Sequence, residues 1–467
     1  MPPSRPRVLM MVDNKVAGDS RVLKSAQTVA DLGYRVLVLG RRGPSAEEVD
    51  EASFRVKLVR VRRRMPPAEE QIFVGRHPLA YPNELAAEAA DATTSGQRWH
   101  RFRQDRRQRA IDATIERAQA LTAAAPQQQA RDLPAHDEYW QSLQPVLVAY
   151  EDAYAPVIEK FRPHVIHAHD FRMVGIAVRA AQRAAAVGNR VPRVVYDAHE
   201  FLPGLEESRE FLAGNSWYEA SHIRRADRIV TVSDPLADLL LDHHRLERRP
   251  SVTLNAPEAA ARTIDPDFTQ DVRSDCGLAD DVPLLVYSGG VAARRGLDVV
   301  IQGLAELPGV HLAIIANRDP AGRALIDATA AESQVTDRVH VLDFVPRERI
   351  IQHLRTADIA VHPMIHLANH EIALPNKFFD YVYAGLPMVV SDVRHLAQVV
   401  DDNGLGRSFP ARDPAAFAAA TRAVLADLPA YRRAVADCPL RDDWTWEAQR
   451  PVLAEMYDTL APLPRPE

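Results

Sequence analysis

The sequence predicts an α/β fold with two domains, each built on a parallel sheet. Short apolar runs that suit strands alternate with longer helix-compatible segments along most of the 467 residues. This length corresponds to two or three domains of about 100–200 residues each. Because open parallel sheets bind ligands beyond the carboxyl ends of their strands, we expect the ligand site in a cleft between two such domains.

The first half of the chain contains six predicted strands. They are expected at residues 8–12, 36–39, 54–58, 165–168, 194–197 and 228–232. Most are short apolar runs, whereas Phe54, Val56 and Leu58 alternate with polar residues, as in a half-buried strand. A helical stretch at 21–32 follows the first strand after a polar loop that contains Gly18.

Between roughly residues 62 and 150 this pattern gives way to an insertion of different composition. It contains an Arg-rich run at 99–109 and an Ala- and Gln-rich helical tract up to Ala130. A basic helix of this kind suits contact with an anionic acceptor or a membrane surface. Asp112 and Glu116 dilute the positive face, which favours a solvated helical excursion instead.

The second half restarts the alternation after a polar stretch at about 256–281. Its strands are expected at residues 284–288, 311–316, 339–344, 359–362 and 388–391. We therefore predict a first domain at 1–257, a second domain at 258–443 and a terminal helix at about 444–467.

Composition argues against several classes of protein. A hydrophobic fraction of 46% and a charged fraction of 26% are globular values, and a net charge of −6 argues against a general nucleic-acid binder. The two cysteines cannot form a disulfide framework. The start has no signal-like apolar region and the chain has no run of 18 apolar residues. We expect a soluble cytoplasmic protein, in which the Arg-rich insertion is the candidate for peripheral contact with the inner face of the membrane.

Motifs for common cofactors do not occur where they are expected. The loops at 14–19 and 288–296 lack the three glycines of a dinucleotide-binding G-x-G-x-x-G, and no Walker-type G-K-[ST] is present. Asp265-Pro266-Asp267 has the D-x-D spacing of some metal-binding loops, but its position in the polar stretch favours a turn. We expect no cofactor and no metal, and a site that neutralises a diphosphate with Arg, Lys and helix ends.

The loop Leu374–Asn376 is the richest in site chemistry. It precedes a predicted helix, where Asn376, Lys377 and the loop amides can hold an anion. Glu371 lies before the loop and Asp380 one turn into the helix. Two carboxylates around an anion site suit the hydroxyls of a sugar and a ribose. An ordinary buried corner between loop and helix is the alternative interpretation.

Over nearly its whole length the chain resembles the retaining GT-B glycosyltransferases of family 4. Residues 287–296 are similar to that family's Y-x-G-R-x(4)-K-G turn, which includes Gly289. Arg295 stands in the Lys position that contacts the donor diphosphate, and Gly290 stands in the usual Arg position. Lys377, in the A-L-P-N-K variant of the donor loop, is expected to supply the missing charge.

The resemblance also assigns the two acids of the family's paired-acid motif. Asp380 corresponds to the second acid, which binds the ribose. Glu371 precedes it by nine positions instead of eight, so His370 competes with Glu371 for the place of the first acid. Leu374 and Pro375 complete the donor loop.

Three segments of the first half support the same resemblance. Asp19, behind Gly18, opens a D-x-R-V segment whose loop lies near the transferred sugar in the family. His169 and Asp170 end an acceptor-side H-x-H segment, in which His167 is the weaker candidate. His199 ends the strand whose histidine approaches the donor sugar in the family. The segment 444–447 resembles the terminal element that crosses back to the first domain.

The resemblance implies two Rossmann-like domains that face each other across a cleft, with the donor in the second. It implies transfer of a sugar from a nucleoside-diphosphate donor to a hydroxyl acceptor, with retention of configuration and without a metal. His199, Arg295, Lys377 and Glu371 are the expected catalytic residues. The alternatives are a sugar-nucleotide epimerase or phosphorylase on the same scaffold, and a non-catalytic protein that binds the nucleotide sugar.

Overall fold

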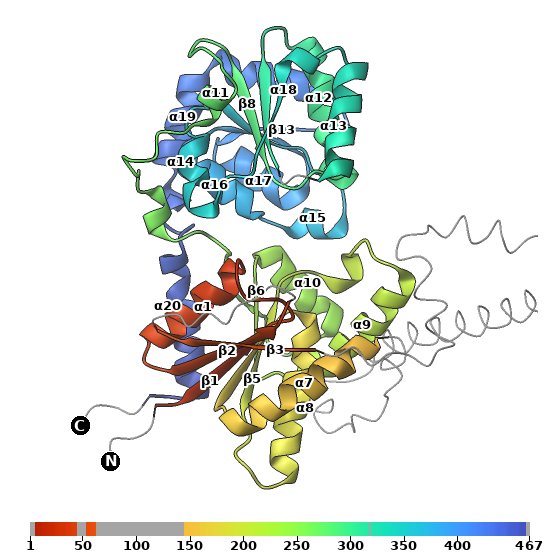
Figure 1. Ribbon diagram of the computed structural model, residues 1–467, viewed down its shortest axis with the longest axis vertical. Helices are drawn as coiled ribbons and strands as arrows, with labels where there is room; N and C mark the ends of the chain where they lie inside the picture. Colours follow the sequence, from red (N-terminus) through yellow and green to blue (C-terminus); the bar gives the residue numbers. More distant parts are fainter. Residues whose placement is uncertain (1–4, 44–52, 62–143, 317–318, 464–467) are drawn as a thin grey trace, which may run out of the picture. The chain divides into compact units, whose positions relative to one another are not determined.

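The computed structural model describes residues 5–43, 53–61, 144–316 and 319–463 (Figure 1). Most of the insertion expected at 62–150 lies outside these residues, so its basic run is not described. The chain divides into two compact units. Unit 1 comprises residues 1–231, 237–252 and 452–467, and unit 2 comprises residues 232–236 and 253–451.

Unit 1 is built on a parallel sheet of seven strands in the order β3-β2-β1-β4-β5-β6-β7. The strands are β1 (Arg7–Met11), β2 (Arg35–Arg41), β3 (Arg55–Val59), β4 (Val165–His169), β5 (Arg193–Ala198), β6 (Arg228–Thr231) and β7 (Ser251–Val252). All of their pairings are parallel. The six strands predicted from the sequence are present, whereas the two-residue β7 was not predicted.

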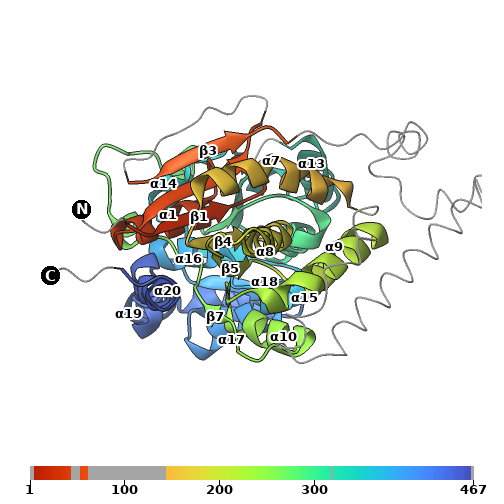
Figure 2. The same ribbon diagram turned by 90° about the horizontal axis from the view of Figure 1, so that it is seen from below.

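Helices pack around the sheet of unit 1. They are α1 (Ser20–Asp31), α7 (Pro145–Phe161), α8 (Phe171–Ala186), α9 (Arg209–His222), α10 (Asp234–His244) and the end of α20 (Trp446–Leu460). Helix α8 packs on β4 and β5, as Figure 2 shows, and α1 contacts β2. The end of α20 is tied into the unit, because Tyr34 donates its hydroxyl proton to the carbonyl of Ala461 at 3.0 Å.

Unit 2 is built on a parallel sheet of six strands in the order β10-β9-β8-β11-β12-β13. The strands are β8 (Leu284–Ser288), β9 (His311–Ile315), β10 (Val339–Leu342), β11 (Ile359–His362), β12 (Met388–Ser391) and β13 (Gly406–Phe409). Along the chain, β9 and β10 extend the sheet on one side of β8. The chain then crosses to the other side of β8, where β11 pairs with it. The carboxyl ends of β8 and β11 therefore form the switch point at which such sheets bind ligands.

Two apolar clusters cover the two faces of this sheet, and each includes one set of helices. One set contains α12 (Leu297–Gly303), α13 (Pro320–Glu332) and α18 (Pro414–Ala426), and the other contains α11 (Val272–Asp275), α14 (Arg347–Leu354), α16 (Asn376–Ala384) and α17 (Arg394–Asp402). The remaining helices of the unit are α15 (Ala368–Ile372) and α19 (Leu428–Asp437). The predicted α/β class with two parallel sheets is confirmed.

Within the described ranges, no helix combines the length and the apolar character that crossing a membrane requires. The Asp265-Pro266-Asp267 segment is a turn, as predicted, in which Asp265 Oδ1 accepts from the Asp267 amide at 3.0 Å.

Candidate functional site

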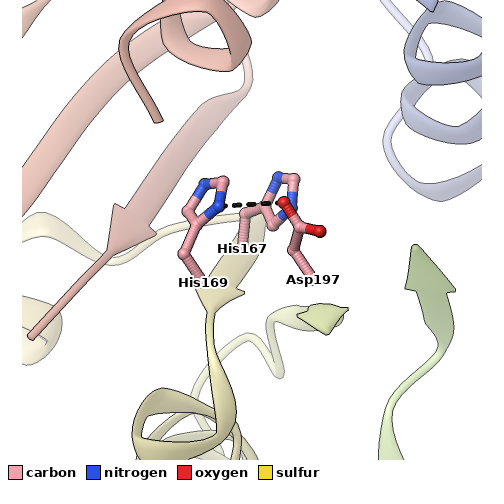
Figure 3. A group of neighbouring side chains, drawn as sticks. All are labelled: His167, His169 and Asp197. Atoms are coloured by element: carbon pink, nitrogen blue, oxygen red, sulfur yellow. Dashed lines mark hydrogen bonds and ion pairs between the residues drawn. The ribbon is translucent and has the colours of Figure 1, made fainter. Parts of the chain in front are cut away.

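The carboxyl edge of the sheet in unit 1 carries a buried cluster around Asp197 (Figure 3). His169, the last residue of β4, lies opposite Asp197 of β5 in the parallel register. Arg21 reaches the same carboxylate from α1, with Nε at 2.8 Å from Oδ2 and Nη2 at 2.7 Å from Oδ1. His169 Nδ1 lies 3.1 Å and His199 Nε2 3.4 Å from Oδ2. One carboxylate therefore organises a guanidinium and two imidazoles.

The carboxylate of Asp197 influences the protonation of the two imidazoles in this cluster. Burial alone would raise the pKa of Asp197, but the charges of Arg21 and His199 outweigh it and hold the pKa well below its usual range. Burial alone would lower the pKa of His199, but Asp197 outweighs it and raises the pKa above its usual value. Burial lowers the pKa of His169 in spite of Asp197. His199 is therefore the imidazole of this cluster that is most readily protonated.

His167 has a structural partner. Its Nδ1 lies 2.8 Å from the hydroxyl of Tyr457 on α20, and burial, with His169, holds its pKa well below the usual value. His167, His169 and Asp197 could bring three ligand atoms within 4.8 Å of one another, as a metal site would need. However, both oxygens of Asp197 already accept from Arg21, whose guanidinium would repel a cation. The cluster thus fits an internal ion-pair network better than a metal centre.

Two of the predicted acceptor-side residues, Asp19 and Asp170, act as helix caps in unit 1. Asp19 caps α1, with Oδ1 accepting from the amide of Val22 at 3.2 Å, and Gly18 before it has a φ of 84°. Asp170 caps α8, with Oδ1 accepting from the amide of Phe171 at 2.7 Å. Burial raises the pKa of Asp170. The contact of these residues with an acceptor stays a prediction.

Glu200 extends the acidic character of this edge. Burial, with the charge of Asp170, raises the pKa of Glu200 to about 7. The sequence did not single out this carboxyl group, because a raised pKa follows from neighbours that are distant in the chain.

The turn after β8 in unit 2 holds Arg295. Gly296 has a φ of 66°, and a Cβ at this position would lie 1.9 Å from the carbonyl oxygen of Pro363, so only glycine fits. This close approach sets the preceding Arg295 beside the end of β11, where its Nη1 lies 3.7 Å from Sδ of Met364. Tyr287 donates to the carbonyl of Gly290 at 2.8 Å and closes the start of the turn.

The predicted donor loop leads into α16. Pro375 is the N-cap of α16 and Asn376 is its first helical residue. Lys377 Nζ lies 3.3 Å from Oδ2 of Asp380, which is 7% exposed. The structure therefore brings together one predicted phosphate ligand and the predicted ribose ligand.

Glu371 is held by two groups of its own unit. Its Oε1 lies 2.5 Å from Nδ1 of His366, and its Oε2 accepts from the amide of Arg394 at 2.8 Å. His366 also reaches Asp392, with Nε2 at 2.9 Å from Oδ1. The bond to Glu371 raises the pKa of His366. The sequence did not predict His366 as a partner of Glu371.

His370, the competitor of Glu371, is buried in α15, and its Nδ1 lies 2.7 Å from the carbonyl oxygen of Ile365. The sequence left the choice between these two residues open, and the contact of either with a sugar stays a prediction.

A cavity of about 300 Å³ lies near the carboxyl ends of β9 and β10 in unit 2. Its lining comprises Val291, Ala316, Asp319, Pro320, Gly322, Arg323, Ile326, Val341, Leu342 and Asp343. It combines apolar walls with carboxylates and a guanidinium, which is the usual composition of a small-molecule pocket. The sequence did not single out these residues, because they converge from a turn, two strands and a helix.

Two family models match the chain. Residues 97–256 match the model described as Glycosyltransferase Family 4, and residues 282–427 match the model described as Glycosyl transferases group 1. The matched segments fall on either side of the polar stretch, and together they include most of the chain.

Named relatives are similar over about two thirds of the chain. A D-inositol 3-phosphate glycosyltransferase of Nocardia farcinica is 26% identical over 67% of this chain and 64% of its own length. A glycogen synthase of Mycobacterium tuberculosis is 27% identical over 64% of this chain and 69% of its own length. The chain thus spans somewhat less than two thirds of the first of these relatives.

Solved structures share the fold over almost the whole chain. A sucrose-phosphate synthase from Thermosynechococcus elongatus has a TM-score of 0.67 at 16% identity and covers 98% of this chain and 99% of its own. Anabaena HepE in complex with UDP-glucose has a TM-score of 0.60 at 12% identity and covers 97% of this chain and 99% of its own. These likenesses show the fold alone.

Proposed function

The chain belongs to the family 4 glycosyltransferases, with the GT-B fold, and we propose that it transfers a glycosyl group from a nucleoside-diphosphate sugar to a hydroxyl acceptor. The proposal includes retention of the anomeric configuration and independence of a metal ion. One relationship supports it. The charges of Arg295 and Lys377 both lower the pKa of the buried His362, the last residue of β11, which is consistent with both cations lying near the carboxyl end of this strand.

Two cations at one sheet end suit the leaving diphosphate. As the glycosyl bond breaks, negative charge develops on the phosphate oxygens, and fixed donors stabilise that charge without reorganising. Arg295 and Lys377 supply the charges, and the amides at the start of α16 supply further donors. In this proposal Asp380, which contacts Lys377, accepts from two ribose hydroxyls.

No residue is proposed as a covalent nucleophile. The departing phosphate accepts the proton of the acceptor hydroxyl, and His199 orients the transferred sugar, both by the resemblance to the family. The contact of His199 with Asp197 suits an orienting residue better than a base. A general base must be unprotonated before it can accept a proton, whereas the raised pKa of His199 favours the protonated ring.

The donor class is supported by the names of structural neighbours. HepE was solved with UDP-glucose and a starch synthase with ADP, which makes a nucleoside diphosphate hexose the first class to test. The acceptor is proposed only as a hydroxyl compound. Cytoplasmic location and contact of the 62–150 insertion with a membrane stay proposals.

The test is release of nucleoside diphosphate from UDP-, GDP- and ADP-hexoses, with and without a panel of sugar, polyol and lipid acceptors. Acceptor-dependent release supports the proposal, and NMR of the product then reports the anomeric configuration. Interconversion of the donor without acceptor indicates an epimerase, and turnover only with inorganic phosphate indicates a phosphorylase. Binding without turnover indicates the non-catalytic alternative.

The same assay tests the independence of a metal. Activity should persist in excess EDTA, because Arg295 and Lys377 neutralise the diphosphate in place of a cation. Loss of activity that Mg²⁺ or Mn²⁺ restores would contradict this part of the proposal.

A further inference from the structure

His362 occupies a position at which a polar side chain is unexpected. It is the last residue of β11, next to β8 at the switch point of the sheet in unit 2. The residue is 5% exposed. Neither ring nitrogen has a hydrogen-bond partner among the described residues. An imidazole always carries at least one N–H donor, so this ring buries a donor that the rest of unit 2 leaves unpaired.

Burying a polar group without a partner costs about 1–3 kcal/mol in proteins, so such a group usually has a partner that comes from outside the chain. An apolar residue would fill the end of a parallel strand without this cost, as Ile359 and Val361 do elsewhere in β11. The position of His362 therefore suggests a ligand.

The groups around His362 indicate the charge of that ligand. Burial, followed by Arg295, His370 and Lys377, lowers the pKa of His362 to about 3. The three neighbours come from three different elements: the turn after β8, helix α15 and helix α16. At neutral pH His362 is thus an uncharged donor near two cations, Arg295 and Lys377. The complementary ligand is an anion with several acceptor oxygens.

Local packing fixes His362 relative to Arg295. The residues after His362 pack against the turn after β8, because the carbonyl of Pro363 fills the space where Gly296 has no Cβ. The sulfur of Met364 accepts from Arg295, and the carbonyl of Met364 accepts from Ser391 at 2.5 Å. These contacts hold the strand end against the turn, and they position the ring and the guanidinium on neighbouring segments.

We propose that His362 binds the diphosphate of the donor, by donating a ring N–H to a phosphate oxygen beside Arg295 and Lys377. This inference rests on the proposed function and deepens it. Gly290 leaves the turn without the Arg of the family motif, and His362 provides one of the missing hydrogen bonds from the neighbouring strand. A neutral donor adds affinity for phosphate without adding a third fixed charge to the protein.

The test compares His362→Leu, His362→Asn and wild type in the full chain by titration calorimetry with UDP, GDP, ADP, inorganic pyrophosphate and the corresponding nucleosides. Because a hydrogen bond to a charged group contributes about 1.5–3 kcal/mol, His362→Leu should bind the diphosphates about 10- to 100-fold more weakly. His362→Asn keeps an N–H donor and should lose less. The affinity for nucleosides, which lack phosphate, should not change.

A matched control separates binding from folding. His311 lies at the amino end of β9 in the same sheet, away from the strand ends that carry the cations, so His311→Leu should keep the affinity for diphosphates. His362→Leu should unfold at the same temperature as wild type or higher, because it removes an unpaired buried donor. A structural histidine would instead lower the unfolding temperature and leave the affinity of the folded protein unchanged, and this outcome would overturn the inference.

A second measurement does not depend on the variants. In protein labelled with ¹⁵N-histidine, the ring resonances of His362 should shift on addition of a diphosphate and not on addition of a nucleoside. Equal diphosphate affinity in wild type and His362→Leu, or no such shift, would overturn this inference and leave the proposed function standing. If wild type binds neither the diphosphates nor pyrophosphate, the proposed function fails and the inference fails with it.

Discussion

Arg21 and Asp197 form a buried ion pair with two parallel hydrogen bonds, although 176 positions separate them in the sequence. Both side chains are almost completely removed from solvent, at 4% and 1% exposure. The pair joins the first helix to the end of β5, where His169 and His199 share the same carboxylate. The positions of His169 and His199, which the sequence predicted at strand ends, therefore depend on Arg21 through its pairing with Asp197.

Loss of Arg21 should destabilise unit 1 strongly. Arg21→Met leaves the buried carboxylate of Asp197 without its guanidinium, and removing one partner of a buried pair costs about 3–5 kcal/mol. At about 2 °C per kcal/mol for a unit of this size, the midpoint of thermal unfolding should fall by about 6 °C or more. Arg193→Ala is the control, because Arg193 is 60% exposed in its pair with Asp227 and should change stability by about 1 kcal/mol or less. Equal effects of the two changes would contradict the prediction.

The contact of His199 with Asp197 should make stability depend on pH in a defined direction. The folded-state pKa of His199 is raised, so its contribution is fully present below about pH 6.5, the usual pKa of histidine, and is lost as pH rises through the folded value. The difference in unfolding free energy between wild type and His199→Gln should therefore shrink from pH 6 to pH 8 in urea titrations.

His222 provides the control of opposite sign. Burial and Arg179 lower its pKa to about 3, so its folded form is neutral and its contribution is lost as pH falls below about 6.5. The difference between wild type and His222→Gln should grow from pH 6 to pH 8. The same trend in both variants would show that the pH dependence arises elsewhere.

The sequence predicted much of the fold because strands buried on both faces read as apolar runs. The runs at 284–288 and 311–316 became β8 and β9 within one residue. It missed β13 because Arg407 and Ser408 interrupt the apolar pattern of an edge strand. A strand at the edge of a sheet has fewer buried positions, so its sequence carries a weaker signal.

Less of the site could be predicted, because partners came from distant parts of the chain. The sequence identified Asp380 and Lys377 as candidates one helical turn apart, and the structure shows that their side chains contact each other. It could not predict that Asp197 pairs with Arg21 or that Glu371 pairs with His366. Neither separation along the chain matches the spacing of neighbouring side chains in a helix or a strand. His362 was not identified as a candidate site residue, because a single histidine in an apolar strand has no local sequence signal of its own.

The two cations of the donor turn and loop should matter for turnover, and their exposed neighbour should not. Arg295→Ala or Lys377→Ala should each cost about 2–4 kcal/mol of transition-state stabilisation, because each removes one charged donor to the diphosphate. Arg294→Ala is the control, because its side chain is exposed. Ratios of kcat/KM measure the effect. Full turnover of Lys377→Ala at saturating donor would show that Lys377 does not replace the charge missing at Gly290.

Restoring the Arg of the family motif should compensate for the loss of Lys377. A Cβ added at Gly290 meets no heavy atom within 4 Å, and its φ is not in the left-handed region, so the backbone accepts a side chain. We expect Gly290→Arg to recover part of the kcat/KM lost in Lys377→Ala, because it adds a cation to the turn that carries Arg295. Gly290→Ala in the same background should not recover it. Equal recovery by both changes would point to an effect on the backbone instead of charge.

The two acids around the donor loop should have opposite kinetic signatures. Asp380→Asn should mainly raise KM for the donor, because a contact to the ribose persists unchanged through the reaction. Glu371→Gln should mainly lower kcat, if its contact to the sugar strengthens as the ring flattens toward an oxocarbenium-like state. His366→Gln should reproduce part of the Glu371 effect, because His366 holds the carboxylate at 2.5 Å and so positions it. A silent Glu371→Gln together with an inactive His370→Ala would assign the place of the first acid to His370.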